Sequence, residues 1–137
     1  MKVDDFEVPD DLYYTKEHDW LKKEGEKCRI GLTDYAQKSL REIVFVDLPQ
    51  ASKKFSQMQS MGTVESVKAV ADVYSPVSGE VVEVNQKLVD SPELVNNSPY
   101  GEGWIAVIKP SNLEAELKNL MNAKSYGDFL KASLSKK

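Results

Sequence analysis

The chain has 137 residues, of which 41% are hydrophobic and 29% are charged, and its formal net charge is −4. This length and apolar content are typical of one domain with one core and argue against a disordered chain. The negative charge argues against nucleic acid as a partner, and no run approaches the roughly 18 apolar residues of a membrane span. We therefore expect a cytoplasmic protein with no membrane partner.

The first third of the chain predicts short strands and one short helix. Residues 1–12 are acidic and predict a flexible N-terminal segment. Residues 13–32 contain two strand-like stretches separated by a turn-like EGE. Thr33 is a suitable N-cap for a helix over residues 34–40, because its hydroxyl can accept a hydrogen bond from the first turn. Residues 43–49 predict a β-branched strand that ends at a proline and leads into a polar loop.

The centre of the chain predicts a hairpin with a lysine at its tip. Residues 62–66 and 69–74 alternate loosely between apolar and polar side chains, and Val67 and Lys68 lie between these two arms. Two-residue hairpin turns favour residues with a positive φ, which neither Val67 nor Lys68 readily adopts. Turn chemistry therefore supports this hairpin only weakly.

Two further strands, separated by a surface loop, are predicted after the hairpin. SPVSG at residues 75–79 is a turn, and residues 80–84 alternate like a strand. Residues 90–103 predict a surface loop with one helical turn, and residues 104–108 form an apolar run that predicts a strand buried on both faces. Short strands joined by turns around one core indicate a mainly β sandwich or flattened barrel.

The C-terminal region predicts one strong helix followed by a weaker one. Ser111 and Glu114 match a capping box. The apolar residues that follow have helical spacing: Leu113, Leu117, Leu120 and Met121. This segment has the clearest helical pattern of the chain, and we expect a short helix over residues 125–130 to follow it.

The single cysteine and single histidine leave little room for catalytic chemistry. Cys28 cannot form an internal disulfide or a cysteine-based zinc site, and its alternation with Ile30 and Leu32 predicts a buried core position. His18 has no neighbouring serine, cysteine or carboxylate at a spacing typical of a catalytic relay. We expect His18 to serve packing or hydrogen bonding, and we predict no metal site.

The string GTVESVKAVADVYSPVSGEVVEVN at residues 62–85 closely resembles the signature region of glycine cleavage H proteins. The resemblance extends through residues 13–20, 30–40 and 91–104, in the family's order. It implies a lipoyl- or biotinyl-carrier-like sandwich of two small antiparallel sheets, with short peripheral helices and a C-terminal helix. Residues 13–137 would form the single lipoyl-carrier domain.

The resemblance implies a non-catalytic carrier subunit of a multienzyme system. Lipoic acid would be attached by an amide bond to Lys68, through a lipoate ligase or a lipoyl or octanoyl transferase. The carrier would then shuttle an aminomethyl group and reducing equivalents from the glycine decarboxylase (P protein) to the aminomethyltransferase (T protein) and the dihydrolipoyl dehydrogenase (L protein). A mobile arm that visits several enzymes is most simply carried by a monomer.

The lysine lies in a modification motif of the same family. Glu65, three residues before Lys68, and Ala69, directly after it, match this motif. We expect the attaching enzyme to read Glu65. The alternative is an ordinary solvated acid.

Two acids match family positions at which the loaded arm folds back into a cleft. Asp19 stands in EHDW, where members more often have His-Glu-Trp, and Asp72 follows the lysine. Carboxylates there would hold the cationic aminomethyl group by charge-assisted hydrogen bonds. His18 adjoins this position as a weaker candidate for sheltering the arm. The alternative for both acids is solvation on a strand surface.

Two departures from the family pattern leave a related role open. Arg41 and Glu42 stand where many members have Gly-Asp, and Met58 stands where glycine is expected. We therefore expect the loop at residues 55–59 to follow another backbone path. These changes keep open a lipoate-binding carrier of the same fold that serves another pathway, either sulfur-compound oxidation or lipoyl relay.

Three other classes of protein remain as rivals. A biotinyl carrier is disfavoured, because methionines typically flank its lysine, whereas Val67 and Ala69 flank Lys68. A free-standing enzyme would need a pocket with convergent polar groups and a nucleophile, base or metal set. An interaction module in which Lys68 is never modified is the third.

Overall fold

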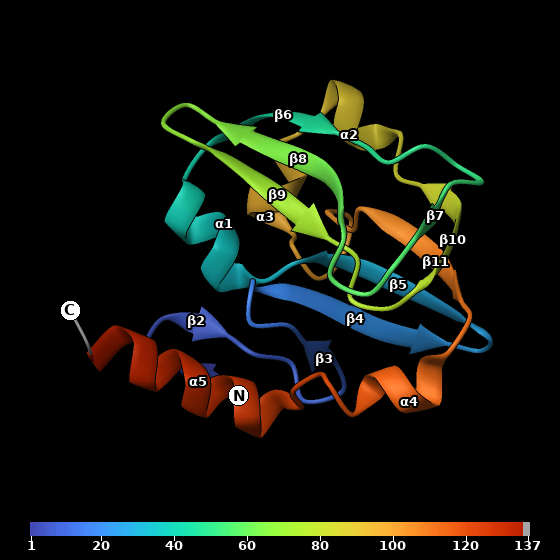
Figure 1. Ribbon diagram of the computed structural model, residues 1–137. Coiled ribbons are helices and arrows are strands. Elements are labelled where there is room, and N and C mark those ends of the chain that lie inside the picture. The colour runs from blue at the N-terminus through green and yellow to red at the C-terminus, as the bar shows by residue number, and fades with distance from the viewer. Residues whose placement is uncertain (136–137) are drawn as a thin grey trace.

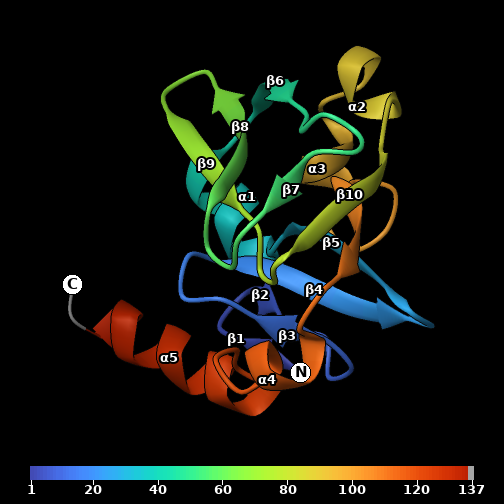
Figure 2. The same cartoon turned by 45° about the vertical axis from the view of Figure 1, so that its right-hand side comes forward.

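Two antiparallel sheets and an outer layer lie on one another in the computed structural model, which describes residues 1–135 (Figures 1 and 2). The large sheet has the strand order β3-β4-β5-β11-β10-β7, and the small sheet has the order β6-β8-β9. The large sheet contains β3 (Tyr13–Tyr14), β4 (Asp19–Glu24), β5 (Lys27–Leu32), β7 (Lys54–Phe55), β10 (Gly79–Val84) and β11 (Ala106–Pro110). The small sheet contains β6 (Ile43–Asp47), β8 (Ser60–Ser66) and β9 (Val70–Tyr74). This mainly β architecture confirms the predicted fold class.

Five helices and a small hairpin complete the described chain. The hairpin pairs β1 (Lys2–Val3) with β2 (Phe6–Glu7). The helices are α1 (Asp34–Leu40), α2 (Lys87–Asp90), α3 (Leu94–Asn97), α4 (Leu113–Leu117) and α5 (Ala123–Ser135). None of the helices in residues 1–135 is long and apolar enough to cross a bilayer.

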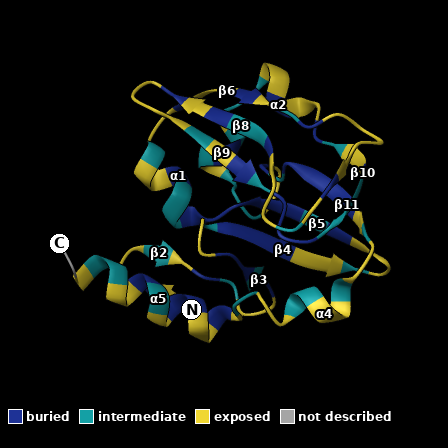
Figure 3. Cartoon of the chain, viewed as in Figure 1, coloured by how far each residue is buried: buried dark blue, intermediate teal, exposed yellow. Residues whose placement is uncertain are grey.

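The main core fills the space between the two sheets. Val64 and Val73 point inward from the small sheet, and Leu21, Ile30 and Ile108 point inward from the large sheet. All five side chains are almost completely buried. Figure 3 shows buried segments in the strands of both sheets. Because side chains of a strand alternate between its faces, the same small sheet keeps a second face toward solvent.

The outer layer buries a second apolar cluster. Trp20 contributes from β4, Tyr14 from β3, and Tyr126 and Leu130 from α5. The rings of Tyr14 and Tyr126 stack with centroids 4.4 Å apart and an interplanar angle of 5°. These large buried side chains anchor α5 below the large sheet.

The N-terminal segment differs from our expectation of a flexible residue 1–12 stretch. Residues 2–7 form the β1–β2 hairpin, and Val3, Val8 and Leu12 are buried in the second cluster. These three apolar side chains are spaced among acidic residues, so the composition of the segment hid its capacity to pack. The last two residues of the predicted 13–137 domain lie outside the described range.

Helix α1 confirms the predicted cap, whereas the two C-terminal helices differ in length from the predicted ones: α4 has 5 residues and α5 has 13. The hydroxyl of Thr33 accepts a hydrogen bond from the N–H of Ala36 at 3.2 Å. In contrast, α4 stops at Leu117, and its N-cap makes no side-chain hydrogen bond. The carboxylate of Glu116 instead accepts hydrogen bonds from the N–H and hydroxyl of Ser78. This contact between Glu116 and a residue far away in the chain cannot be read from the helical spacing.

Two residues that replace the family's glycines adopt backbone angles that glycine favours. Met58 has a φ of 67°, and Arg41 has a φ of 69° with a ψ of −142°. Met58 thus adopts the angle that the expected glycine would favour, and another backbone path at residues 55–59 stays a prediction. The N–H of Met58 donates to the carbonyl of Ser75 at 2.6 Å, which helps to hold the turn despite its strain.

We predict that Arg41→Gly stabilises the protein by about 1 kcal/mol, because glycine adopts this backbone conformation without the steric cost of a side chain. Urea unfolding of both proteins measures the difference. The matched control is Lys22→Gly, at an exposed strand position outside the positive-φ residues, which should lose stability. An unchanged or lower free energy of unfolding for Arg41→Gly would contradict the predicted strain.

Candidate functional site

Lys68 lies at the tip of the β8–β9 hairpin, as the sequence pattern predicted. The tip projects from the small sheet (Figure 1) and is coloured as exposed in Figure 3. Within residues 1–135, the side-chain amine of Lys68 forms none of the hydrogen bonds or ion pairs that the structure contains. The amine is therefore accessible to another protein without breaking an internal contact.

The side chain of Ser66 closes the turn that residue preferences left doubtful. Neither Val67 nor Lys68 has a positive φ. Instead, the buried hydroxyl of Ser66 accepts hydrogen bonds from the N–H of Lys68 at 3.3 Å and of Ala69 at 3.0 Å. The N–H of Ser66 also donates to the carbonyl of Ala69 at 2.7 Å. The sequence pattern did not single out the role of Ser66 in the turn, although serine hydroxyls form such local hydrogen bonds with the backbone.

A second set of hydrogen bonds braces the tip from the start of β6. The N–H of Val67 donates to the carbonyl of Glu42 at 3.2 Å. Asn96 from α3 holds this segment on both sides. Its side-chain oxygen accepts from the N–H of Ile43 at 2.9 Å, and its amide donates to the carbonyl of Arg41 at 2.7 Å. The strained backbone at Arg41 thus directly precedes the carbonyl that supports the lysine turn.

Glu65, Lys68 and Ala69 are exposed together at this end of the hairpin. Glu65 pairs with Phe45 of β6 on one side and with Val70 of β9 on the other. Because the adjacent Val64 is buried, Glu65 points away from the core. The geometry therefore leaves the carboxylate available to a partner that approaches the lysine.

Asp19 and Asp72, which the sequence singled out separately, both raise the pKa of Tyr74 at the far end of β9. Asp72 is exposed and accepts a hydrogen bond from the hydroxyl of Ser60 at 2.9 Å. The negative charge of Asp72 raises the pKa of Tyr74, and burial and the charges of Glu17 and Asp19 raise it further. The charges of three acids thus raise the pKa of one tyrosine. None of these acids forms an ion pair with Lys68 in the described chain.

Asp19 is buried, so it does not occupy the solvated strand surface that was the alternative for this residue. One of its two carboxyl oxygens has no hydrogen-bond partner in residues 1–135. The residue has 0% exposure, and its Oδ2 accepts a hydrogen bond from the hydroxyl of Thr15 at 2.8 Å. Its Oδ1 is buried with no hydrogen-bond partner among residues 1–135. Burial raises the pKa of Asp19 well above its ordinary value of 3.8, and the hydroxyl of Thr15 and the nearby backbone N–H of Tyr74 only partly offset this. An unsatisfied oxygen of this kind would gain from a donor that a bound group provides.

His18 and Cys28 occupy structural positions. The Nδ1 of His18 lies 2.8 Å from the hydroxyl oxygen of Tyr126, and its ring packs against Tyr35 with centroids 4.5 Å apart. Burial lowers the pKa of His18 to about 4, so its ring is neutral near pH 7. Cys28 is fully buried, and burial raises the pKa of its thiol to about 11, which keeps the nucleophilic thiolate scarce.

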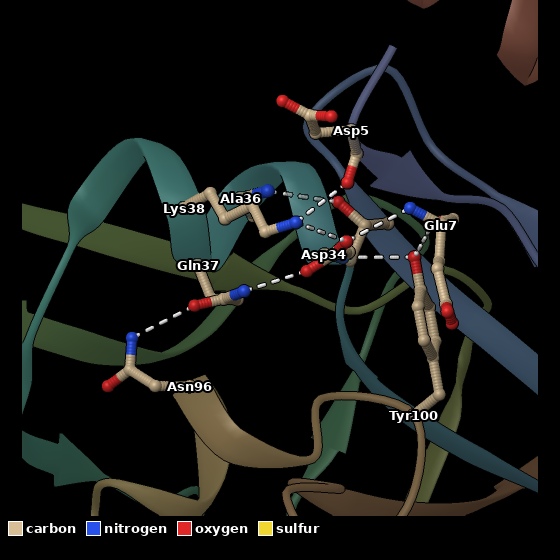
Figure 4. A network of polar contacts seen from close by, with 9 residues as sticks. Asp5, Glu7, Asp34, Ala36, Gln37, Lys38, Asn96 and Tyr100 are labelled. Carbon is tan, nitrogen blue, oxygen red and sulfur yellow. Dashed lines mark hydrogen bonds and ion pairs between the residues drawn. The ribbon is translucent and has the colours of Figure 1, made fainter. Parts of the chain in front are cut away.

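A polar cavity of about 410 Å³ beside α1 is a rival site, but its buried groups bind one another. Asp34 lies at the centre of this network (Figure 4), where it accepts hydrogen bonds from the N–H of Glu7 at 2.9 Å and from the amide of Gln37 at 2.7 Å. Burial alone would raise the pKa of Asp34, but these hydrogen bonds and the ion pair with Lys38 lower it. The network therefore joins segments of the fold. Residues 1–135 contain no cluster of three or more potential metal ligands.

Comparisons with known proteins agree with this arrangement over almost the whole chain. A family model described as glycine cleavage H-protein matches residues 12–133. The chain is 53% identical over 133 residues to a probable glycine cleavage system H protein of Pyrococcus abyssi, covering 96% of this chain and 98% of that protein. It is 50% identical over 123 residues to a glycine cleavage system H protein of Halothermothrix orenii, covering 90% and 95%. A crystal structure of a glycine cleavage system H protein from Mycobacterium marinum superposes with a TM-score of 0.81 at 35% identity, covering 88% of this chain and 97% of that one.

We predict that Asp19→Asn stabilises the protein at neutral pH, because a neutral amide avoids the cost of burying a charge. Because the pKa of Asp19 is raised in the folded protein, its contribution to the free energy of unfolding is favourable below pH 3.8. This contribution is lost as the pH rises through the pKa of the folded state. The advantage of the variant should therefore grow with pH, by up to about 1.4 kcal/mol per pH unit. Urea unfolding at pH 5 and pH 8 tests this.

The control for this substitution is Asp72→Asn, because Asp72 is exposed and already satisfied by neighbouring hydroxyls. Its free energy of unfolding should change by less than about 0.5 kcal/mol. A wild-type protein that is as stable as Asp19→Asn at both pH values would show that Asp19 carries no buried-charge penalty.

Proposed function

Because the chain belongs to the glycine cleavage H-protein family, we propose that it is a lipoyl carrier in which lipoic acid is joined by an amide bond to Lys68. The carrier shuttles an aminomethyl group and reducing equivalents from the glycine decarboxylase to the aminomethyltransferase and the dihydrolipoyl dehydrogenase. A lipoate ligase or a lipoyl or octanoyl transferase attaches the group. The observation that carries this proposal is the exposed lysine amine at a braced hairpin tip.

The tip suits acylation for three physical reasons. The amine of Lys68 makes no internal contact within residues 1–135, so its acylation and loss of charge cost no ion pair. The hydroxyl of Ser66 and the carbonyl of Glu42 hold the backbone beneath it. A fixed backbone with a free side chain presents the amine in one position and lowers the entropy lost on docking.

When attached, the lipoyl group supplies a disulfide that can be opened, loaded and closed again by partner enzymes. The residues of this chain orient and shelter the arm. Asp72 provides negative charge near Tyr74 that suits a cationic amine, and the buried carboxyl of Asp19 offers an oxygen without a partner. A hydrogen bond from the cationic amine to Oδ1 would satisfy the one side-chain oxygen that is buried without a partner in residues 1–135.

The carrier itself contributes no catalytic group in this proposal. His18 is half-buried, neutral near pH 7 and engaged with Tyr126, and Cys28 is buried as a protonated thiol. Neither meets the requirement for an accessible nucleophile or base. The chemistry then belongs to the enzymes that the arm visits, which is compatible with a monomeric carrier.

Lys68→Arg is expected to abolish acylation, because the guanidinium retains the charge but lacks a nucleophilic amine. The intact mass of protein purified from its native cells should show one lipoyl increment that disappears in this variant. Lys22→Arg, an exposed lysine on β4, should keep the increment. Native protein without the increment would contradict the proposal and favour an unmodified interaction module.

The pathway is tested by reconstitution of the lipoylated chain with the glycine decarboxylase. We expect glycine-dependent exchange of carbon dioxide that requires the lipoyl group and is absent with Lys68→Arg. A lipoylated chain that supports no exchange would contradict the glycine cleavage role. That result would favour the carrier of sulfur-compound oxidation or lipoyl relay, which the departures at Arg41 and Met58 kept open.

A further inference from the structure

The solvent face of the small sheet carries a row of three exposed residues next to the lysine. Phe45, Glu65 and Val70 lie directly opposite one another on β6, β8 and β9. Phe45 is 53% exposed and Val70 is 62% exposed. Residues in register on neighbouring strands are in contact distance, so an acid lies between two apolar side chains.

A second row, one step further from the tip, adds negative charge. Asp47, Thr63 and Asp72 occupy the same positions on the three strands, and both acids are exposed. Between the two rows lies the residue set Val46, Val64 and Ala71, of which Val46 and Val64 are buried. This alternation places both outer rows on the solvent face. We call these six residues the outer-sheet surface; they are Phe45, Asp47, Thr63, Glu65, Val70 and Asp72.

A groove continues this surface at Phe45. It has a volume of about 590 Å³ and runs between β6, the segment after it, and α2. Its lining is mixed: apolar residues such as Phe45, Leu48 and Val89 alternate with the polar residues Asp47, Gln50 and Gln86. Val89 is 60% exposed. An aromatic side chain that is half-exposed on an edge strand beside a groove offers a site for an apolar group of a partner.

We propose that the outer-sheet surface is the docking site of the enzyme that acylates Lys68. The enzyme would place arginine or lysine side chains opposite Asp47, Glu65 and Asp72, and an apolar side chain against Phe45 and Val70. The inference rests on the proposed function, because it assumes that Lys68 is acylated. It extends recognition from the single residue Glu65 to a cross-strand surface.

The attaching enzyme is favoured over the other partners by the position of the reacting atom. Acylation requires the amine nitrogen of Lys68 itself to enter the active site, so the enzyme must cover the strands next to the tip. The enzymes that act on the disulfide meet it at the far end of an arm. Their contacts with the first row are therefore not required by the chemistry.

Charge complementarity favours a basic enzyme surface over a second copy of this chain. The outer-sheet surface has three carboxylates and no basic side chain. Two copies that met through it would place carboxylates opposite carboxylates, which opposes association. A basic partner surface would be attracted to it, and this attraction would weaken as salt increases.

The test measures the initial rate of acylation by a purified lipoate ligase with lipoate and ATP, followed by intact mass. We expect Phe45→Ala and Glu65→Lys each to lower the rate by about tenfold at subsaturating carrier, as expected for central residues of an interface. The controls on β10 are Val82→Ala and Glu83→Lys, which change an exposed apolar residue and an exposed acid outside this surface. Both should retain the wild-type rate.

Asp47→Lys and the salt dependence keep the test independent of folding. This substitution changes only an exposed charge and should lower the rate at low salt while the thermal unfolding curve stays unchanged. The wild-type rate should fall with increasing salt more steeply than the Asp47→Lys rate.

Three outcomes overturn separate claims. A wild-type chain that is never acylated at Lys68 overturns the proposed function. Normal acylation of the wild type and of every outer-sheet variant overturns the docking surface alone. A concentration-dependent dimer in sedimentation that the Phe45→Ala substitution dissolves would assign the surface to a second copy and overturn the proposed occupant.

Discussion

The hydroxyl of Ser66 is the constraint on which the presentation of Lys68 depends. A two-residue turn without glycine lacks the backbone freedom that favours such hairpins. The structure replaces that freedom with hydrogen bonds from the N–H groups of Lys68 and Ala69 to one buried oxygen, and with the carbonyl of Glu42 beneath Val67. The backbone can therefore remain in place while the lysine side chain stays free.

Backbone strain and buried acids occur at separate points of the fold. Arg41 holds a backbone conformation typical of glycine directly before the carbonyl that braces the tip. Asp19 is buried with one oxygen unpartnered, whereas the buried Asp34 is hydrogen-bonded by its neighbours and has a lowered pKa. The pKa of one buried aspartate is therefore raised and that of the other is lowered within the same fold. Strain and unsatisfied groups of this kind tend to mark functional sites, where stability is exchanged for function.

The layers of the fold separate support from recognition. The second apolar cluster, built around Trp20 and Tyr126, fixes α5 and the N-terminal hairpin on the large sheet. The small sheet is left with one face in the core and one face in solvent. That free face carries Phe45, Glu65 and Val70 in register beside the lysine. In the proposed carrier, this uncovered face leaves room for the acylating enzyme to approach the lysine.

The sequence by itself determined most of the strands, the Thr33 cap and the position of Lys68 between two alternating arms. These features depend on residues close together in the chain, so periodicity and capping rules detect them. Its family motifs also singled out Asp19 and Asp72 as candidate residues, but they did not predict that Asp19 is buried. The local pattern misjudged α4 and α5, because their lengths depend on distant partners rather than on helical spacing.

Only the tertiary structure decided which residues meet across the strands and which acids lose contact with water. The row that joins Phe45 to Glu65 and Val70 depends on the register of three strands, and local alternation does not specify which residues face each other. The burial of Asp19 likewise depends on elements far away in the chain. Burial and register are sums over long-range contacts, whereas the sequence pattern reports the conformation of each segment alone.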